Sequence, residues 1–172
     1  MSLKAELSLQ SGFSLVEVLV SLIVISIGLL GNAGMQALAI NNTAIARNRS
    51  LAAIEADALA SMMHANVGYW NMSITSFSIS GTTLGNSTLN SQTTDCIANT
   101  CSASQMAGYD LKQWGTLVAN LLPSGTGNVA CSAATSTSGV SCVITVSWLE
   151  NKLILNQTGT SETQNYTLVV QP

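Results

Sequence analysis

Residues 13–40 read FSLVEVLVSLIVISIGLLGNAGMQALAI, and Glu17 is the only ionisable side chain among them. As an α-helix this stretch would be about 42 Å long, enough to cross a hydrocarbon core of about 30 Å. The alternative is a helix buried in a globular core, but an apolar run of this length without lysine or arginine rarely fits inside a small domain. The sequence therefore predicts that residues 13–40 span a membrane.

The helical pattern continues beyond this apolar stretch. No proline occurs before Pro123 and alanine is frequent, which predicts a single helix from Phe13 to Ala65. In the second half of this helix we expect one apolar stripe, formed by Leu51, Ile54, Ala58 and Met62. The intervening positions include the charged residues Arg47, Arg49, Glu55 and Asp57. A small domain cannot bury such a helix along its whole length. The first half therefore needs lipid or other subunits, and the second half can carry a globular head.

The composition argues against enzymes and against proteins that bind nucleic acids. Only 8% of the 172 residues are charged, whereas an ordinary soluble domain has roughly a quarter. Five Lys and Arg against eight Asp and Glu give a net charge of -3, which offers no cationic surface to a row of phosphates. The single histidine, His64, lies near the expected helix end, where we expect it to cap or pack. The sequence thus predicts no enzyme, no cofactor, no metal site and no small-molecule substrate.

Residues 66–172 are expected to form a head domain of the α+β class. Residues 69–94 are rich in Ser, Thr, Asn and Gly, which predicts loop with short strand pieces at Met72, Ile74, Phe77 and Ile79. A short amphipathic helix is predicted over residues 110–122 from the spacing of Leu111, Trp114, Val118 and Leu121 or Leu122. Pro123 should end this helix, with residues 124–127 as a turn.

Strands are expected after this turn. The apolar side chains of residues 140–148 alternate with Ser and Thr, which is typical of a half-buried strand. Residues 129–131 should pair with this strand, residues 153–155 could continue the meander, and residues 166–170 should form a last strand. An antiparallel sheet packed on the long helix would result, an α+β fold.

The four cysteines lie in the second half of the chain and indicate a disulfide framework formed in an oxidising compartment. Three connectivities are open. Loop closure favours Cys96 with Cys101 and Cys131 with Cys142, and the second pair would join the two strands of the expected hairpin. The competing interpretation is a four-thiolate zinc site, but these spacings lack the short repeated knuckle of such sites.

Glu17 is the most informative single residue. A carboxylate inside an apolar segment costs several kcal/mol in lipid unless a cation meets it, and no Lys or Arg lies within helical reach. The amino group of a chain cut nearby would serve as that cation. Alternatively, Glu17 lies just outside the hydrocarbon among the headgroups, and physical reasoning alone leaves both interpretations open.

The residues around Glu17 resemble the prepilin cleavage motif of type IV pilins and their relatives; they read Gly12-Phe13-Ser14-Leu15-Val16-Glu17-Val18-Leu19-Val20. The resemblance implies that residues 1–12 are a leader, which a prepilin peptidase removes by cutting between Gly12 and Phe13. It also implies that the new amino group of Phe13 is N-methylated and that Glu17 pairs with the amino terminus of a neighbouring subunit during assembly. The polar leader does not read as a secretory signal, because no small-residue cleavage site follows the apolar run.

Further along the chain, three features are similar to one kind of minor pilin: Asp110-x-x-x-Trp114, residues 122–127 and the strand at 143–148. The resemblance implies a single-pass inner-membrane protein that later enters a pilus, at its tip. Its partners would be other minor and major pilins, the prepilin peptidase and the inner-membrane assembly platform. The Lys and Arg count does not decide the orientation, but the cysteines place the head in the periplasm and the amino terminus in the cytoplasm.

Two other interpretations remain at this point. The first is a pseudopilin of a type II secretion system. Deletion of its gene would abolish exoprotein release, whereas deletion of a pilin gene would abolish surface pili. The second is a membrane-anchored periplasmic binding module, for example a surface lectin. Such a module would keep residues 1–12 and would not need Glu17.

Overall fold

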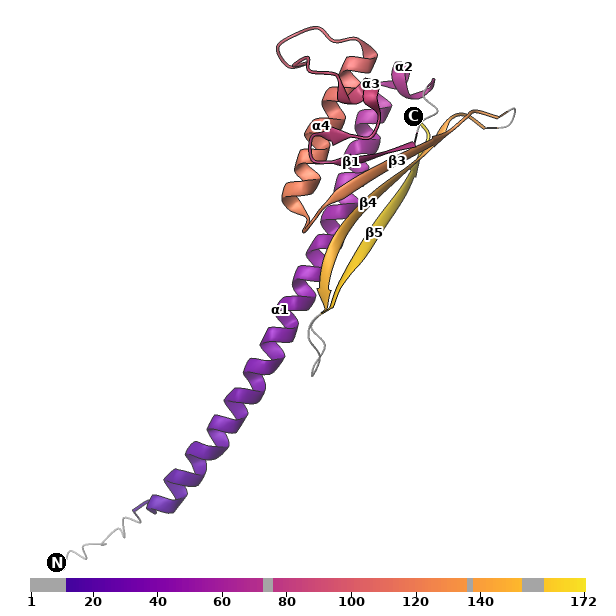
Figure 1. Cartoon of the computed structure of the whole chain (residues 1–172). Helices are drawn as coiled ribbons and strands as arrows, with labels where there is room; N and C mark the ends of the chain where they lie inside the picture. The colour runs from indigo at the N-terminus through magenta and orange to yellow at the C-terminus, as the bar shows by residue number, and fades with distance from the viewer. Residues whose placement is uncertain (1–11, 73–75, 136–137, 153–159) are drawn as a thin grey trace, which may run out of the picture. The chain divides into compact units, whose positions relative to one another are not determined.

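The structure is a computed structural model that describes residues 12–72, 76–135, 138–152 and 160–172 (Figure 1). The chain divides into two compact units, residues 1–40 and residues 41–172. Residues 1–11 of the expected leader, the expected strand position Ile74 and the expected strand at 153–155 lie outside the described residues.

The first helix, α1, extends over Leu15–Ala65, so the prediction of one long helix is confirmed. Up to Ile40 its side chains are exposed, apart from the partly buried Leu38. In the second unit the predicted apolar stripe is wrong at Ile54, which is 61% exposed, whereas Leu51 and Met62 are partly buried against the core. Glu55, expected at an intervening polar position, is only 8% exposed. Half of the residues on the buried face are alanines; the face consists of Ala52, Glu55, Ala56, Leu59, Ala60 and Met63. Alanines on this face let the rest of the head approach the helix backbone closely, which hydrophobic periodicity alone does not predict.

Short elements follow α1, in the region where loop with strand pieces was expected. They are α2 (Val67–Trp70), β1 (Ser76–Ser80), β2 (Thr83–Leu84) and α3 (Ser87–Asn90). In β1 the side chains of Phe77 and Ile79 are buried between exposed serines, as the alternation predicted. Met72, in contrast, is 82% exposed and lies in no strand.

The second long helix, α4, extends over Ala103–Leu121 and begins seven residues before the predicted start at Asp110. A capping box explains the difference: the Ser102 hydroxyl accepts a hydrogen bond from the Gln105 backbone N–H, and the Gln105 side chain accepts one from the Ser102 N–H. This reciprocal pair satisfies two of the N–H groups that a helix start leaves unpaired. The end of α4 before Pro123 agrees with the prediction.

The remaining strands, β3 (Thr126–Ser132), β4 (Ser141–Lys152) and β5 (Thr160–Val170), complete a five-stranded antiparallel sheet of order β2-β1-β3-β4-β5 (Figure 1). The predicted hairpin of β3 with β4 is confirmed, with Val129 opposite Ile144 and Cys131 opposite Cys142. The predicted turn at residues 124–127 is too long, since β3 already begins at Thr126. Strand β5 begins six residues before the predicted Tyr166, because it pairs with β4 along its whole length.

The core of the second unit lies where one face of the sheet meets α4 and the later half of α1. Trp114 of α4 is fully buried, and its indole N–H donates to the Glu55 backbone carbonyl of α1 at 2.8 Å. Val129, Ile144, Val146 and Trp148 cover the same core from the sheet. The predicted α+β architecture, a long amino-terminal helix packed on an antiparallel sheet, is thereby confirmed.

Candidate functional site

The start of α1 brings Gly12, Phe13 and Glu17 onto one short segment. Residues 12–14 precede the helix, and the Ser14 carbonyl accepts the backbone N–H groups of Glu17 at 3.0 Å and Val18 at 3.2 Å. The Phe13 side chain is 83% exposed. The peptide bond between Gly12 and Phe13 therefore lies in exposed, non-helical backbone, the kind of backbone that a peptidase can bind and cleave.

Glu17 lies in the first turn of α1, where the helix dipole favours a negative charge. Its side chain is exposed, and its neighbours at Val16, Val18 and Val20 are exposed apolar residues. Within the described residues no cation pairs with Glu17. The segment thus presents an acidic group in an apolar surrounding, which a positive group from outside the described chain would complete.

The surface of α1 around Glu17 suits lipid or the helices of other subunits. Among the described helices, α1 is the one that is long and apolar enough to cross a membrane, and the apolar window is 0% buried within the chain. Leu22, Leu29 and Leu30 are each at least 60% exposed. An exposed apolar surface of this length marks a site for membrane or protein contact, because water is a poor solvent for it.

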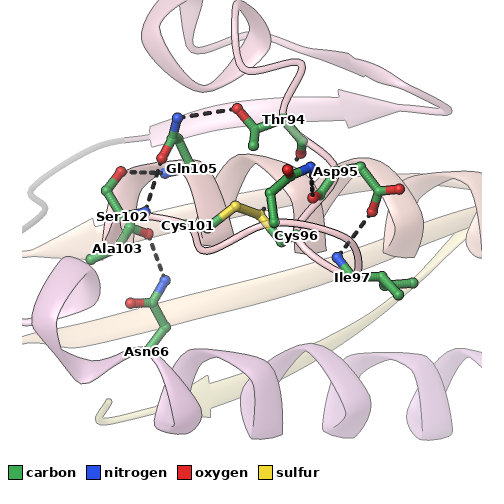
Figure 2. Close-up of a disulfide and its surroundings, with 10 residues drawn as sticks. Asn66, Thr94, Asp95, Cys96, Ile97, Cys101, Ser102, Ala103 and Gln105 are labelled. Atoms are coloured by element: carbon green, nitrogen blue, oxygen red, sulfur yellow. Dashed lines mark hydrogen bonds between the residues drawn. A yellow bond between two sulfur atoms is a disulfide. The ribbon is translucent and has the colours of Figure 1, made fainter.

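Both disulfides lie in the second unit. Cys96 is joined to Cys101 within the loop before α4, and Cys131 is joined to Cys142 across the β3–β4 hairpin. All four cysteines are thereby used, so no thiolate remains for a zinc ion. Figure 2 shows the first disulfide beside the capping box of α4, where it closes a loop that is also held by the hydrogen bond from Ile97 N–H to Asp95 Oδ1 (2.9 Å).

An ion pair between a buried acid and an exposed base in the head was not predicted from the sequence. Glu150 on β4 is 1% exposed, and its two carboxylate oxygens accept from Arg49 Nε and Nη2 on α1, each at 3.1 Å. The Trp148 indole N–H also donates to Glu150 Oε1 at 3.1 Å. Hydrogen bonding to Glu150 raises the pKa of Arg49 above its ordinary value, so the cation is retained. This ion pair links α1 to β4 of the sheet, so we assign it a structural role.

The signal for this contact was present in the sequence. The alternation that places Cys142, Ile144, Val146 and Trp148 on the buried face reaches Glu150 at its next step. A carboxylate at a buried strand position needs a cation, and Arg49 supplies it from a segment 101 residues away. No local sequence pattern could identify Arg49 as this partner.

Two other carboxyl groups are affected by burial. Desolvation raises the pKa of Glu55 on α1 and the pKa of Asp110 on α4 above their ordinary values. No hydrogen bond of either side chain occurs within the described residues, and no group of three or more His, Cys, Asp or Glu there could hold a metal ion. The burial of these two acids therefore bears on the stability of the head.

Comparison with known proteins bears on the start of α1. The family described as the prokaryotic N-terminal methylation motif matches residues 7–31, which include Gly12, Phe13 and Glu17. No curated protein and no solved structure matches the chain. The motif is the type IV pilin-like prepilin motif, and together with the apolar helix it supports a membrane-anchored structural subunit of the pilin or pseudopilin kind.

Proposed function

We propose that this chain is a minor type IV pilin, similar to the type IV pilus modification protein PilV, that takes part in the initiation and assembly of a pilus. The observation that carries the proposal is Glu17, an acid in the first turn of an apolar helix, four residues after Phe13 and inside the matched motif. The match supports membership at the level of pilins and pseudopilins. The closer assignment to a minor pilin depends on the features around Trp114 and residues 122–127.

The mechanism follows from the placement of the charges. The chain inserts as a single-pass inner-membrane protein with its amino terminus in the cytoplasm and its head in the periplasm. A prepilin peptidase removes residues 1–12, and the amino group of Phe13 becomes a methylated cation. When the subunit docks onto the assembly platform beside another pilin, Glu17 pairs with the amino terminus of that neighbour. Two opposite charges in a medium of low dielectric attract strongly, so the pair sets the register of the contact.

A substitution in α1 tests this mechanism. Glu17→Gln keeps the side-chain shape and removes the charge, so we expect the processed subunit to remain in the membrane while its share in filaments falls by about tenfold or more. Ser26→Ala is the matched control, since Ser26 is another polar, exposed residue of the same apolar segment, and its hydroxyl donates to the Leu22 carbonyl of its own helix. Normal incorporation of Glu17→Gln subunits into filaments would overturn the proposal.

A pseudopilin of a type II secretion system is the second candidate, since the matched motif supports it equally. Deletion of the gene separates the two. Lost surface pili with normal exoprotein release supports the minor pilin, and lost exoprotein release with normal pili supports the pseudopilin.

A further inference from the structure

A cleft of about 480 Å³, lined mainly by residues with polar side chains, lies in the second unit, between α4 and the loop at residues 92–95. From α4 it is lined by Tyr109 and Gln113, and from the loop by Gln92 and Asp95. Threonines supply most of the remaining wall. The volume lies in the range of about 300–1,000 Å³ that is usual for small-molecule sites, and neither the membrane helix nor the methylation motif accounts for this cleft.

The charges at the cleft favour a neutral ligand. Its two charged side chains, Asp95 and Lys112, have opposite signs. The Lys112 ammonium group already donates to the backbone carbonyls of Asn90 at 2.8 Å and Gln92 at 2.6 Å. Because two of its three donors are used in holding the loop, Lys112 is poorly placed to capture a phosphate or a carboxylate.

The groups that remain can exchange hydrogen bonds with hydroxyls. One oxygen of Asp95 accepts the Ile97 N–H, which leaves its other oxygen as an acceptor. The Gln92 amide nitrogen donates to the Thr88 carbonyl, so its amide oxygen remains as an acceptor. The exposed Gln113 amide and the Tyr109 hydroxyl make no hydrogen bond within the described residues, and the half-buried Tyr109 ring adds an apolar surface.

The loop side of the cleft is held before any ligand arrives. The Gln105 side chain of α4 donates to Thr94 Oγ1 at 3.1 Å, and the disulfide of Cys96 with Cys101 closes the next turn of chain, as Figure 2 shows. With the two Lys112 contacts, these interactions fix the loop to α4. A fixed site loses less entropy on binding, which favours affinity for a small ligand.

We propose that this cleft binds a neutral saccharide. The C–H face of a sugar ring packs on an aromatic side chain, while its hydroxyls donate to carboxylate and amide oxygens and accept from amide N–H groups; the cleft presents these partners together around Tyr109. The site binds its ligand without turnover, so it is compatible with a protein that has no enzymatic activity. It is also independent of the proposed function, because a sugar site on the head requires neither processing nor assembly.

The test uses the full chain in a detergent that contains no sugar, and a panel of neutral and sialylated oligosaccharides as probes. We expect at least one neutral oligosaccharide to bind, with an affinity that salt leaves unchanged and that a sialic acid does not increase. Oligosaccharides that bind while their free monosaccharides do not would identify a glycan chain as the source, and equal binding would identify free sugar. Absence of binding by every neutral probe at millimolar concentration would overturn the proposal.

Substitutions locate the binding to the cleft. Tyr109→Ala and Gln113→Ala should each weaken it by about tenfold, whereas Tyr166→Ala, which removes a partly exposed tyrosine of β5 that does not line the cleft, should leave it unchanged. Gln113 is exposed, so its variant keeps the test valid if Tyr109→Ala fails to fold. Replacing Cys96 and Cys101 by serine should weaken binding more than replacing Cys131 and Cys142. Binding that Tyr109→Ala and Gln113→Ala both leave unchanged would contradict the assignment.

Discussion

Arg49 and Glu150, 101 residues apart in the chain, form a two-point ion pair in which Nε and Nη2 each lie 3.1 Å from a carboxylate oxygen. The Glu150 side chain is 0% exposed and that of Arg49 is 57% exposed, so the acid is buried and the base reaches it from the surface. Trp148 donates a third hydrogen bond to the same carboxylate. The contact therefore fixes the position of α1 against β4 within the second unit.

Removing the positive charge of Arg49 should lower the thermal stability more than removing the negative charge of Glu150. Arg49→Met leaves a buried carboxylate without the cation that compensates its charge, so we expect Tm to fall by several degrees, and by more than in Glu150→Gln, which removes the charge itself. Arg47→Met is the matched control, because Arg47 is exposed and forms no ion pair within the described residues. Thermal unfolding followed by near-UV circular dichroism measures the three variants. Equal Tm values for the Arg49 and Arg47 variants would contradict the structural role of the pair.

Gly127 should tolerate no side chain, because Trp114 occupies the space beside it. A Cβ atom at Gly127 would lie 2.4 and 2.5 Å from two carbons of the Trp114 ring. That ring is fully buried and held by its hydrogen bond to the Glu55 carbonyl, so it cannot move aside. We expect Gly127→Ala to lower the free energy of unfolding by about 1–3 kcal/mol.

Denaturant unfolding monitored by tryptophan fluorescence measures this effect. Gly139→Ala serves as the control, since a Cβ atom there would meet nothing within 4 Å. If both variants unfold at the same denaturant concentration, the close packing of Trp114 on β3 is wrong.

Local patterns in the sequence predicted the elements with strong periodicity. The uninterrupted apolar run and the absence of proline predicted α1, and the alternation at residues 140–148 predicted β4. The start of α4 was missed although Ser102 and Gln105 carry its capping signal. The buried face of α1 was predicted wrongly at Ile54 and Glu55, because the small alanines on that face contribute little to hydrophobic periodicity.

The candidate sites also differ in how far local sequence patterns could predict them. Gly12, Phe13 and Glu17 could be recognised because their motif is local, lying within six residues of chain. The pairing of Arg49 with Glu150 could not, since it depends on how α1 packs against a strand far along the chain. The cleft at Tyr109 likewise depends on the fold, because Lys112 and the Cys96–Cys101 disulfide hold its loop against α4.

Glu55 should make the head less stable as the pH rises. Burial raises the pKa of its carboxyl in the folded state, so between the unfolded and the folded pKa the native state binds more protons than the unfolded state. The contribution of Glu55 to stability is therefore fully present below the unfolded pKa, about 4.3, and is lost as the pH rises through the folded pKa. Glu55→Gln should unfold with a higher free energy at pH 7 and with a smaller decrease from pH 4 to pH 7.

The exposed acid two residues further along α1 provides the comparison. Asp57→Asn removes the same charge from the solvent-facing side of the helix, so it should leave both the stability at pH 7 and the pH profile close to those of the parent chain. Urea unfolding at a series of pH values compares the three proteins. A destabilised Glu55→Gln with an unchanged pH profile would show that the carboxylate is partnered and charged in the native state.

The amino terminus of the mature protein tests the central proposal most directly. Mass spectrometry of the chain isolated from assembled material should find a first residue of Phe13 carrying a methyl group on its amino nitrogen, with residues 1–12 absent. An unprocessed chain that begins at Met1 in functional, assembled material would contradict the account, because Glu17 would then lack the amino-terminal cation that its apolar surroundings require.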